Sequence, residues 1–104
     1  MCLEMAGLKV DPRKHRVLKH NREVKLTFKE FKLLELLLRN PGEVISRDEF
    51  LDQVWGKDVF VTHRTVDTHI SALRKKIEDN PEEPSYILSV RGVGYKFNED
   101  LTEP

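Results

Sequence analysis

Short apolar stretches alternate with charged residues along the first quarter of the chain. They fall at residues 8–10, 16–18 and 24–26, and turn-forming residues stand between them at 11–12 and 20–22. Alternation of this kind, interrupted by turn residues, is typical of β-strands. We therefore expect a small antiparallel sheet at the start of the fold.

From residue 27 onward the apolar residues recur at helical spacing instead. A first helix is expected behind the capping-box pattern of Thr27 and Glu30, and it ends before the Pro-Gly pair that follows. A second helix is expected from the capping-box pattern that begins at Ser46, and it extends to Trp55. One short strand, at 44–45, is expected between the two helices.

A third helix is expected over about residues 63–78, after a loop at 56–61. On a helical wheel of about 100° per residue, its apolar side chains form a narrow stripe that we expect to face the core. The stripe consists of Val66, Ile70, Leu73 and Ile77. The opposite side carries Arg64, Thr68, Ser71 and Lys75, with Thr65, His69 and Ala72 on one flank and Asp67 and Arg74 on the other. We expect Asp67 to orient a neighbouring arginine.

The last apolar segments predict a β-hairpin. Its strands are expected at 86–90 and 95–97, and the turn between them contains Gly92 and Gly94. We expect both glycines to supply the positive φ that a tight turn requires. Arg91 would then stand near the tip of the hairpin.

Charge changes this picture, because it is unevenly distributed. The net charge is zero, with 18 basic and 18 acidic residues. Basic residues predominate in 1–40 and 62–77, and acidic residues predominate in 41–61 and 78–104. A chain polarised in this way can present a basic face to phosphate. The alternative is that the charges are scattered over an ordinary solvated surface.

Length and composition restrict the class of protein. A chain of 104 residues corresponds to one domain, no stretch is apolar enough for a membrane span, and no signal-peptide pattern begins it. The single cysteine, Cys2, cannot form an internal disulfide, which favours a cytoplasmic protein with an exposed, unreactive thiol. His15, His20, His63 and His69 show no metal-ligand spacing. We expect no catalytic residue, no metal, no cofactor and no enzyme activity.

The second and third helices, with the loop between them, form a helix-turn-helix pattern with a longer turn than usual. In that motif the second helix enters the major groove, so the outer side of 63–78 would meet base edges and phosphates. Arg91 on a slim hairpin tip can reach a minor groove, where narrow A·T-rich stretches concentrate negative potential. The Tyr95 hydroxyl is a candidate phosphate donor. Trp55 is either a phosphate contact through its indole N–H or a core residue, and both alternatives stay open.

Together, these segments resemble the winged-helix DNA-binding output domain of OmpR/PhoB-type response regulators. The resemblance covers about residues 8–97. Four motifs carry it, namely Leu26-Thr27-x-Lys29-Glu30-Phe31-x-Leu33-Leu34, Ser46-Arg47-x-x-x-Leu51-x-x-Val54-Trp55-Gly56, Arg64-Thr65-Val66-Asp67-x-His69-Ile70-x-x-Leu73-Arg74-Lys75-Lys76 and Val90-Arg91-Gly92-x-Gly94-Tyr95.

The resemblance implies an α+β fold class, a winged helix-turn-helix with an N-terminal small antiparallel sheet, three helices and a C-terminal β-hairpin wing at about 89–97. Residues 8–98 would form the winged-helix effector domain. Residues 1–7 would be the remnant of a linker or the start of an expressed fragment, and 99–104 a tail. The implied function is sequence-specific binding of double-stranded DNA as the output domain of a two-component response regulator that controls transcription.

The resemblance also implies roles for particular residues and partners. Phosphate contacts would come from Trp55, Arg64, Thr65, His69, Arg74 and Tyr95. Base-facing positions would be Thr68, Ser71 and Ala72, with Lys75 on the same outer face and Arg91 in the minor groove. The loop Gly56, Lys57, Asp58, Val59, Phe60 and Val61 would meet RNA polymerase. A phosphorylatable receiver domain of the same protein, absent from this chain, would drive head-to-tail self-association on direct-repeat half-sites.

Family members often carry basic side chains where this chain has Ser71 and Ala72. Recognition through the helix is therefore expected to be less guanine-directed, with a larger share for phosphate contacts and DNA shape. The alternative function is a winged-helix protein-interaction module without DNA binding. Such a module would need apolar anchors on the outer face of the third helix, and the sequence places none there.

Overall fold

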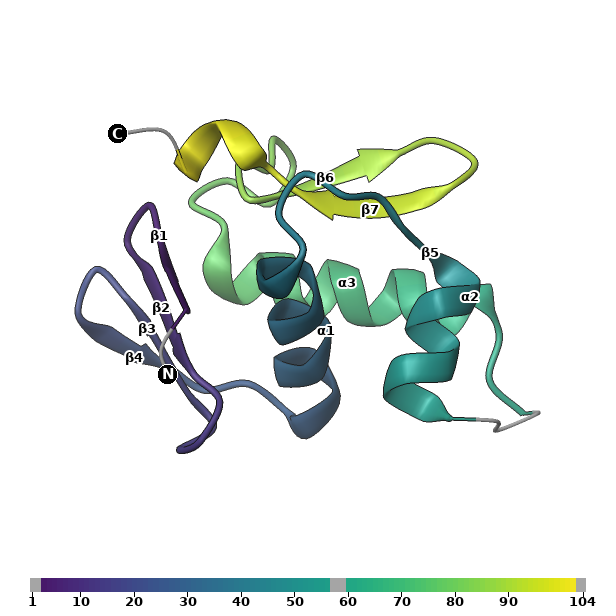
Figure 1. The fold of residues 1–104 in the computed structure, drawn as a ribbon, viewed down its shortest axis with the longest axis horizontal. Coiled ribbons are helices and arrows are strands. Elements are labelled where there is room, and N and C mark those ends of the chain that lie inside the picture. The colour runs from purple at the N-terminus through teal and green to yellow at the C-terminus, as the bar shows by residue number, and fades with distance from the viewer. Residues whose placement is uncertain (1–2, 57–59, 103–104) are drawn as a thin grey trace.

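A computed structural model describes residues 3–56 and 60–102 of the chain. Figure 1 shows a sheet at the N-terminus, helices in the middle and a long hairpin above them. The elements are β1 (Leu3–Met5), β2 (Leu8–Asp11), β3 (Arg16–Lys19), β4 (Arg22–Val24), α1 (Phe28–Arg39), β5 (Ile45–Ser46), α2 (Arg47–Phe50), η1 (Leu51–Trp55), α3 (His63–Ile77), β6 (Ile87–Val90), β7 (Gly94–Phe97) and η2 (Glu99–Thr102). This order confirms the expected winged helix-turn-helix. Cys2 and the predicted loop residues Lys57, Asp58 and Val59 lie outside the described residues.

The N-terminal sheet is antiparallel and has the order β1-β2-β3-β4. The prediction that residues 1–7 form a linker is wrong for β1, in which Leu3 pairs with Val10. The run Leu3-Glu4-Met5 is too short to reveal its alternation. The last strand, β4, begins earlier than predicted because His20 and Asn21, with φ of 49° and 68°, complete a two-residue hairpin turn by themselves.

The core lies between α1, α3 and the two sheets. The capping box at the start of α1 is confirmed, since the Glu30 amide donates to Thr27 Oγ1 and the Thr27 amide donates to Glu30 Oε1. The predicted apolar stripe of α3 is also confirmed, because Val66, Ile70 and Leu73, like Ile77, have no exposed surface. The helix α3 is therefore held firmly along its inner side.

The predicted second helix is continuous but not uniform. Ser46 caps it by accepting the Glu49 amide, and after α2 the winding becomes π-helical in η1. The short strand before it, β5, lies one residue later than predicted, at Ile45–Ser46. Ser46 therefore ends a strand and caps a helix at once, which places the start of α2 directly beside the second sheet.

The second sheet has the order β5-β7-β6. The prediction that both hairpin glycines adopt positive φ is wrong for Gly94, since only Gly92, at 79°, does so. Gly94 is needed for another reason, because a Cβ there would lie 2.0 Å from the carbonyl oxygen of Ile45 on β5. The tail prediction for 99–104 is wrong in part, since η2 follows the hairpin and Leu101 packs against the core.

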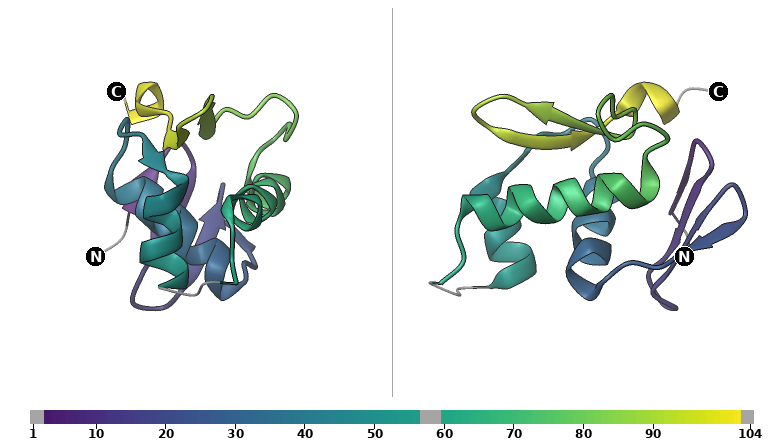
Figure 2. Two further views of the ribbon diagram at one scale, coloured as in Figure 1. Left: turned by 90° about the vertical axis from the view of Figure 1, so that its right-hand side faces the viewer. Right: turned by 180° about the vertical axis from the view of Figure 1, so that it is seen from behind.

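No helix in the described residues has the length and apolar character needed to cross a membrane. The view from behind shows how the parts lie relative to one another (Figure 2, right). The helix α3 crosses the molecule in front of α1 and α2, and the β6–β7 hairpin runs above it with its turn toward the N-terminal end of α3. The N-terminal sheet stands at the other end.

Candidate nucleic-acid interface

The outer side of α3 is open. Arg64, Thr68, Ser71 and Lys75, predicted to face away from the core, are all exposed. They line a shallow groove together with Asp67 and Ala72. The groove contains hydroxyl groups and cationic side chains, and its one apolar side chain, Ala72, is small. Contact between these residues and DNA stays a prediction.

Hydrogen bonds hold the start of α3 in place, both within its first turn and to α2. The Thr62 amide donates to Thr65 Oγ1 at 3.4 Å, and the Thr65 amide donates to the Thr62 carbonyl at 2.9 Å. In addition, His63 Nε2 lies 2.7 Å from Asp48 Oδ1 on α2. These bonds fix the direction in which the helix leaves the preceding loop.

The hairpin is fastened to the N-terminal half of α3 through Asp67. The Tyr95 hydroxyl donates to Asp67 Oδ1 at 2.6 Å, and Arg47 Nε donates to the same oxygen at 2.8 Å. The expectation that Asp67 orients an arginine is confirmed, and the arginine is Arg47 of α2. The Tyr95 hydroxyl, predicted to reach phosphate, is used inside the protein, and the residue is only 6% exposed.

The ionisation of this cluster follows from its contacts. Burial acts to raise the pKa of Asp67, but the bonds from Tyr95 and Arg47, with the charge of Arg47, lower the pKa below its ordinary value. Burial and the bond to Asp67 raise the pKa of Tyr95. Asp67 therefore stays ionised and Tyr95 stays protonated, which keeps the bond between them intact.

A second attachment joins the hairpin to the C-terminal half of α3. The Arg74 guanidinium donates to the Ile87 carbonyl at 2.8 and 3.2 Å and to Ser89 Oγ at 2.9 Å. Its central carbon lies 5.3 Å from the centre of the Tyr95 ring. These two attachments hold the hairpin against α3, and its turn lies toward the N-terminal end of that helix (Figure 2).

The turn of the hairpin carries Arg91, which is exposed as predicted. The Val93 amide donates to the Val90 carbonyl at 2.9 Å, and Gly92 supplies the positive φ of this turn. Figure 2 shows this turn lying toward the N-terminal end of α3. An arginine and a groove-sized helix are thus held on one rigid unit.

A cluster of two rings and one lysine flanks α3 where η1 meets it. The rings of Trp55 and His69 lie edge to face with centroids 5.0 Å apart. Lys29 of α1 donates to the Val54 carbonyl at 3.0 Å and lies 5.6 Å from the Trp55 ring. Trp55 is half-buried and packs partly against the core, in line with the core alternative, and its contact with phosphate stays a prediction.

Two residues of this surface, Arg47 and Lys29, were not among the predicted site residues. Both stand inside the family motifs, and Arg47 is one of two basic residues within the predominantly acidic stretch 41–61. That local contrast of charge was the signal available for Arg47. Lys29 had no comparable signal, because other lysines stand nearby at positions 25 and 32.

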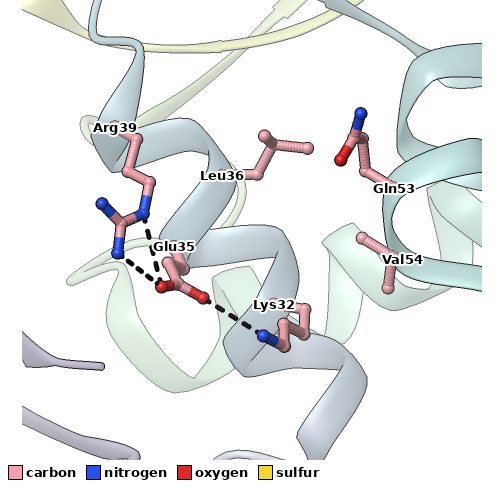
Figure 3. Close-up of a pocket in the computed structure, with 6 residues that line it drawn as sticks. All are labelled: Lys32, Glu35, Leu36, Arg39, Gln53 and Val54. Carbon is pink, nitrogen blue, oxygen red and sulfur yellow. Dashed lines mark hydrogen bonds and ion pairs between the residues drawn. The ribbon is translucent and has the colours of Figure 1, made fainter. Parts of the chain in front are cut away.

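A pocket between α1 and η1 contains Lys32, Glu35 and Arg39 (Figure 3). Glu35 pairs with Arg39 at 2.9 Å and with Lys32 at 3.6 Å, so each charge in this row has an ionic partner. Within residues 3–56 and 60–102 no group of His, Cys, Asp or Glu side chains is arranged to hold a metal ion.

Comparison with known proteins agrees with this geometry. Residues 21–97 match the family described as "Transcriptional regulatory protein, C terminal". The chain is 51% identical over 95 residues to the alkaline phosphatase synthesis transcriptional regulatory protein SphR of Synechococcus elongatus, covering 91% of this chain and 37% of SphR. It is 42% identical over 95 residues to the sensory transduction protein RegX3 of Mycolicibacterium smegmatis, covering 91% of this chain and 42% of RegX3. The chain thus spans about two fifths of the length of these relatives.

Solved structures show the same fold. The response regulator DrrB, a Thermotoga maritima OmpR/PhoB homolog, superposes with a TM-score of 0.87 at 38% identity, covering 93% of this chain and 44% of DrrB. The DNA-binding domain of Klebsiella pneumoniae RstA, solved in complex with the RstA box, superposes with a TM-score of 0.86 at 34% identity, covering 94% of this chain and 97% of that domain. The family is one of transcriptional regulators, not of enzymes. The chain belongs to the family of C-terminal, winged-helix domains of OmpR/PhoB-type response regulators.

Proposed function

We propose that this chain binds double-stranded DNA sequence-specifically as the output domain of a two-component response regulator and thereby controls transcription. In this proposal α3 enters the major groove and the turn of the hairpin meets the adjacent minor groove. The observation that carries it is the double attachment of the hairpin to α3, through Asp67–Tyr95 and through Arg74 to β6. One duplex can therefore meet both surfaces at once.

The dimensions and chemistry of α3 support this placement. A helix of 15 residues is roughly 22 Å long, and a B-form major groove about 12 Å wide admits it. The small side chains of Thr68, Ser71 and Ala72 allow the backbone of α3 to approach the bases closely. Arg64 and Lys75 stand on the same open side and suit the phosphates that border the groove.

The remaining assignments of DNA contacts belong to this proposal. Trp55, Thr65, His69 and Arg74 are expected at phosphates and Arg91 in the minor groove. For Tyr95 the expectation changes, because its hydroxyl is donated to Asp67 and supports the surface from within. The Klebsiella RstA domain, solved with its DNA box, provides a template of the same fold for such a complex.

The relatives suggest partners beyond DNA. Because the chain spans about two fifths of SphR and RegX3, a receiver domain in the same protein is part of the proposal. We expect head-to-tail pairing on direct-repeat half-sites and a contact between RNA polymerase and the loop 56–61. The domain would act in the cytoplasm, where it meets the chromosome.

Site selection from random duplexes tests the proposal. The purified chain is expected to enrich a common half-site, and its affinity for the recovered duplex is expected to fall steeply with salt, because phosphate contacts release counterions. Enrichment of no sequence, with binding that ignores salt, would contradict DNA recognition. It would leave the protein-docking alternative, for which the open face of α3 lacks apolar anchors.

A further inference from the structure

His69 holds its ring in one tautomer through a bond within its own helix. Its Nδ1 atom lies 2.9 Å from the carbonyl oxygen of Thr65. A carbonyl oxygen only accepts hydrogen bonds, so Nδ1 carries the proton. In the neutral ring, Nε2 is then the bare nitrogen, and it presents a lone pair rather than an N–H group.

The described contacts of His69 are with the Trp55 ring and with its own helix. The Trp55 ring of η1 packs edge to face with the His69 ring. The Lys29 ammonium of α1 lies 5.6 Å from the centre of the Trp55 ring. Two turns further along α3, Lys76 pairs with Glu30 of α1 at 2.7 Å, so this acid is already neutralised. Among the described residues no acidic side chain is bonded to His69.

A DNA phosphate oxygen is an acceptor, so the neutral ring of His69 would place a lone pair against it. Only the imidazolium form offers an N–H at Nε2 while keeping the bond to Thr65. We propose that His69 contacts a backbone phosphate solely as imidazolium, so that binding of DNA takes up one proton at this residue. This inference rests on the proposed function and assigns a proton-linked regulation to it.

The sign of the effect follows from linkage. A negative phosphate beside His69 stabilises the protonated ring, so the complex binds more protons than the free components do. Affinity for DNA therefore rises as the pH falls. Uptake of one proton on binding corresponds to up to tenfold in affinity per pH unit.

The experiment measures the dissociation constant for the duplex recovered by site selection, at constant ionic strength, from about pH 8 to about pH 6. The wild-type chain is expected to gain up to tenfold per pH unit over part of this range. His69→Gln, whose amide donates at any pH, is expected to bind without this slope. His63→Gln serves as the matched control and is expected to retain it, since His63 is bonded to Asp48.

Nitrogen-15 NMR of the ring provides a second readout that needs no variant. At a pH where the free ring is neutral, Nδ1 is expected to be protonated and Nε2 bare, and addition of the duplex is expected to protonate both. A wild-type affinity that is flat with pH, a slope that persists in His69→Gln, or a ring that stays neutral in the complex would overturn the inference. Failure to bind DNA at every pH would instead refute the proposed function.

Discussion

Tyr95 donates its hydroxyl to Asp67 at 2.6 Å, and this bond joins the wing to the helix expected to read DNA. The two residues are 28 positions apart in the chain. The Tyr95 ring is buried, and its centre lies 5.7 and 5.3 Å from the guanidinium carbons of Arg47 and Arg74. The bond therefore fastens the hairpin to α3, the two elements that we propose meet DNA.

Tyr95→Phe removes this bond and keeps the ring. We predict a loss of about 1 kcal/mol in the free energy of unfolding, because the carboxylate of Asp67 regains water when the hydroxyl is gone. Urea denaturation of Tyr95→Phe, Asp67→Asn and the double variant measures the coupling in a double-mutant cycle. Strictly additive effects would show that the bond contributes nothing to stability.

Arg91→Ala is predicted to weaken DNA binding by about 1–3 kcal/mol, and most strongly at A·T-rich flanks, because the guanidinium would read the narrow minor groove there. Titration of duplexes that differ only in the flank measures it. Arg13→Ala is the matched control, since Arg13 is exposed on the β2–β3 turn of the N-terminal sheet, away from the wing (Figure 1). Equal losses for both variants would contradict a specific role of the wing.

Arg74→Ala is predicted to weaken binding to all sequences alike and to reduce the slope of affinity against salt by about one, as expected for a phosphate contact. The structure adds a second role, because Arg74 also bonds to β6. Ser89→Ala removes part of that attachment without removing a charge and is expected to leave the salt slope unchanged. If Arg74→Ala also leaves it unchanged, Arg74 only positions the wing.

Glu30→Gln is predicted to make stability less dependent on pH. Burial acts to raise the pKa of Glu30, but the bonds from Lys76 and Thr27, with the charge of Lys76, lower the pKa below its ordinary value. A lowered pKa in the folded state contributes stability above the unfolded value of about 4.3, and this contribution is lost as the pH falls through the folded value.

Glutamine preserves the capping box and removes the ion pair, so we expect a loss of about 1–2 kcal/mol at neutral pH. The difference between wild type and Glu30→Gln should shrink as the pH falls below about 4, where the wild-type carboxyl is also uncharged. Urea denaturation at both pH values measures it. A difference that is constant with pH would mean that the Lys76 pair does not stabilise the fold.

Gly94→Ala is predicted to destabilise the domain more than Gly92→Ala. A Cβ at 94 would lie 2.0 Å from the Ile45 carbonyl oxygen, whereas nothing lies within 4 Å of one at 92. The cost at 92 is the left-handed backbone alone, about 1–2 kcal/mol. At 94 the strands β5 and β7 must separate. Thermal denaturation of the two variants compares these costs, and a smaller loss for Gly94→Ala would refute the close approach.

The accuracy of the sequence-based predictions depends on how local their causes are. The capping box of Thr27 and Glu30 and the buried stripe headed by Val66 were predicted correctly, because both depend on residues a few positions apart in the chain. The strand β1 was missed because three residues are too few to show a period. For Gly94 the predicted requirement, a positive φ, was wrong. Glycine is required there by the close approach of Ile45, which is distant in the chain.

The sequence by itself determined the family, the order of the elements and which side of α3 faces the core, since motifs, caps and helical period are written into neighbouring residues. Only the tertiary structure decided that Asp67 accepts hydrogen bonds from both Arg47 and Tyr95 and that Arg74 bonds to the hairpin. It also decided that the Thr65 carbonyl bonds to Nδ1 of His69, which makes Nδ1 the protonated nitrogen. Most of these bonds join separate elements, and the His69 ring, which makes the bond within α3, also packs against Trp55 of η1. Their geometry is set by packing in three dimensions, which no spacing along the chain records.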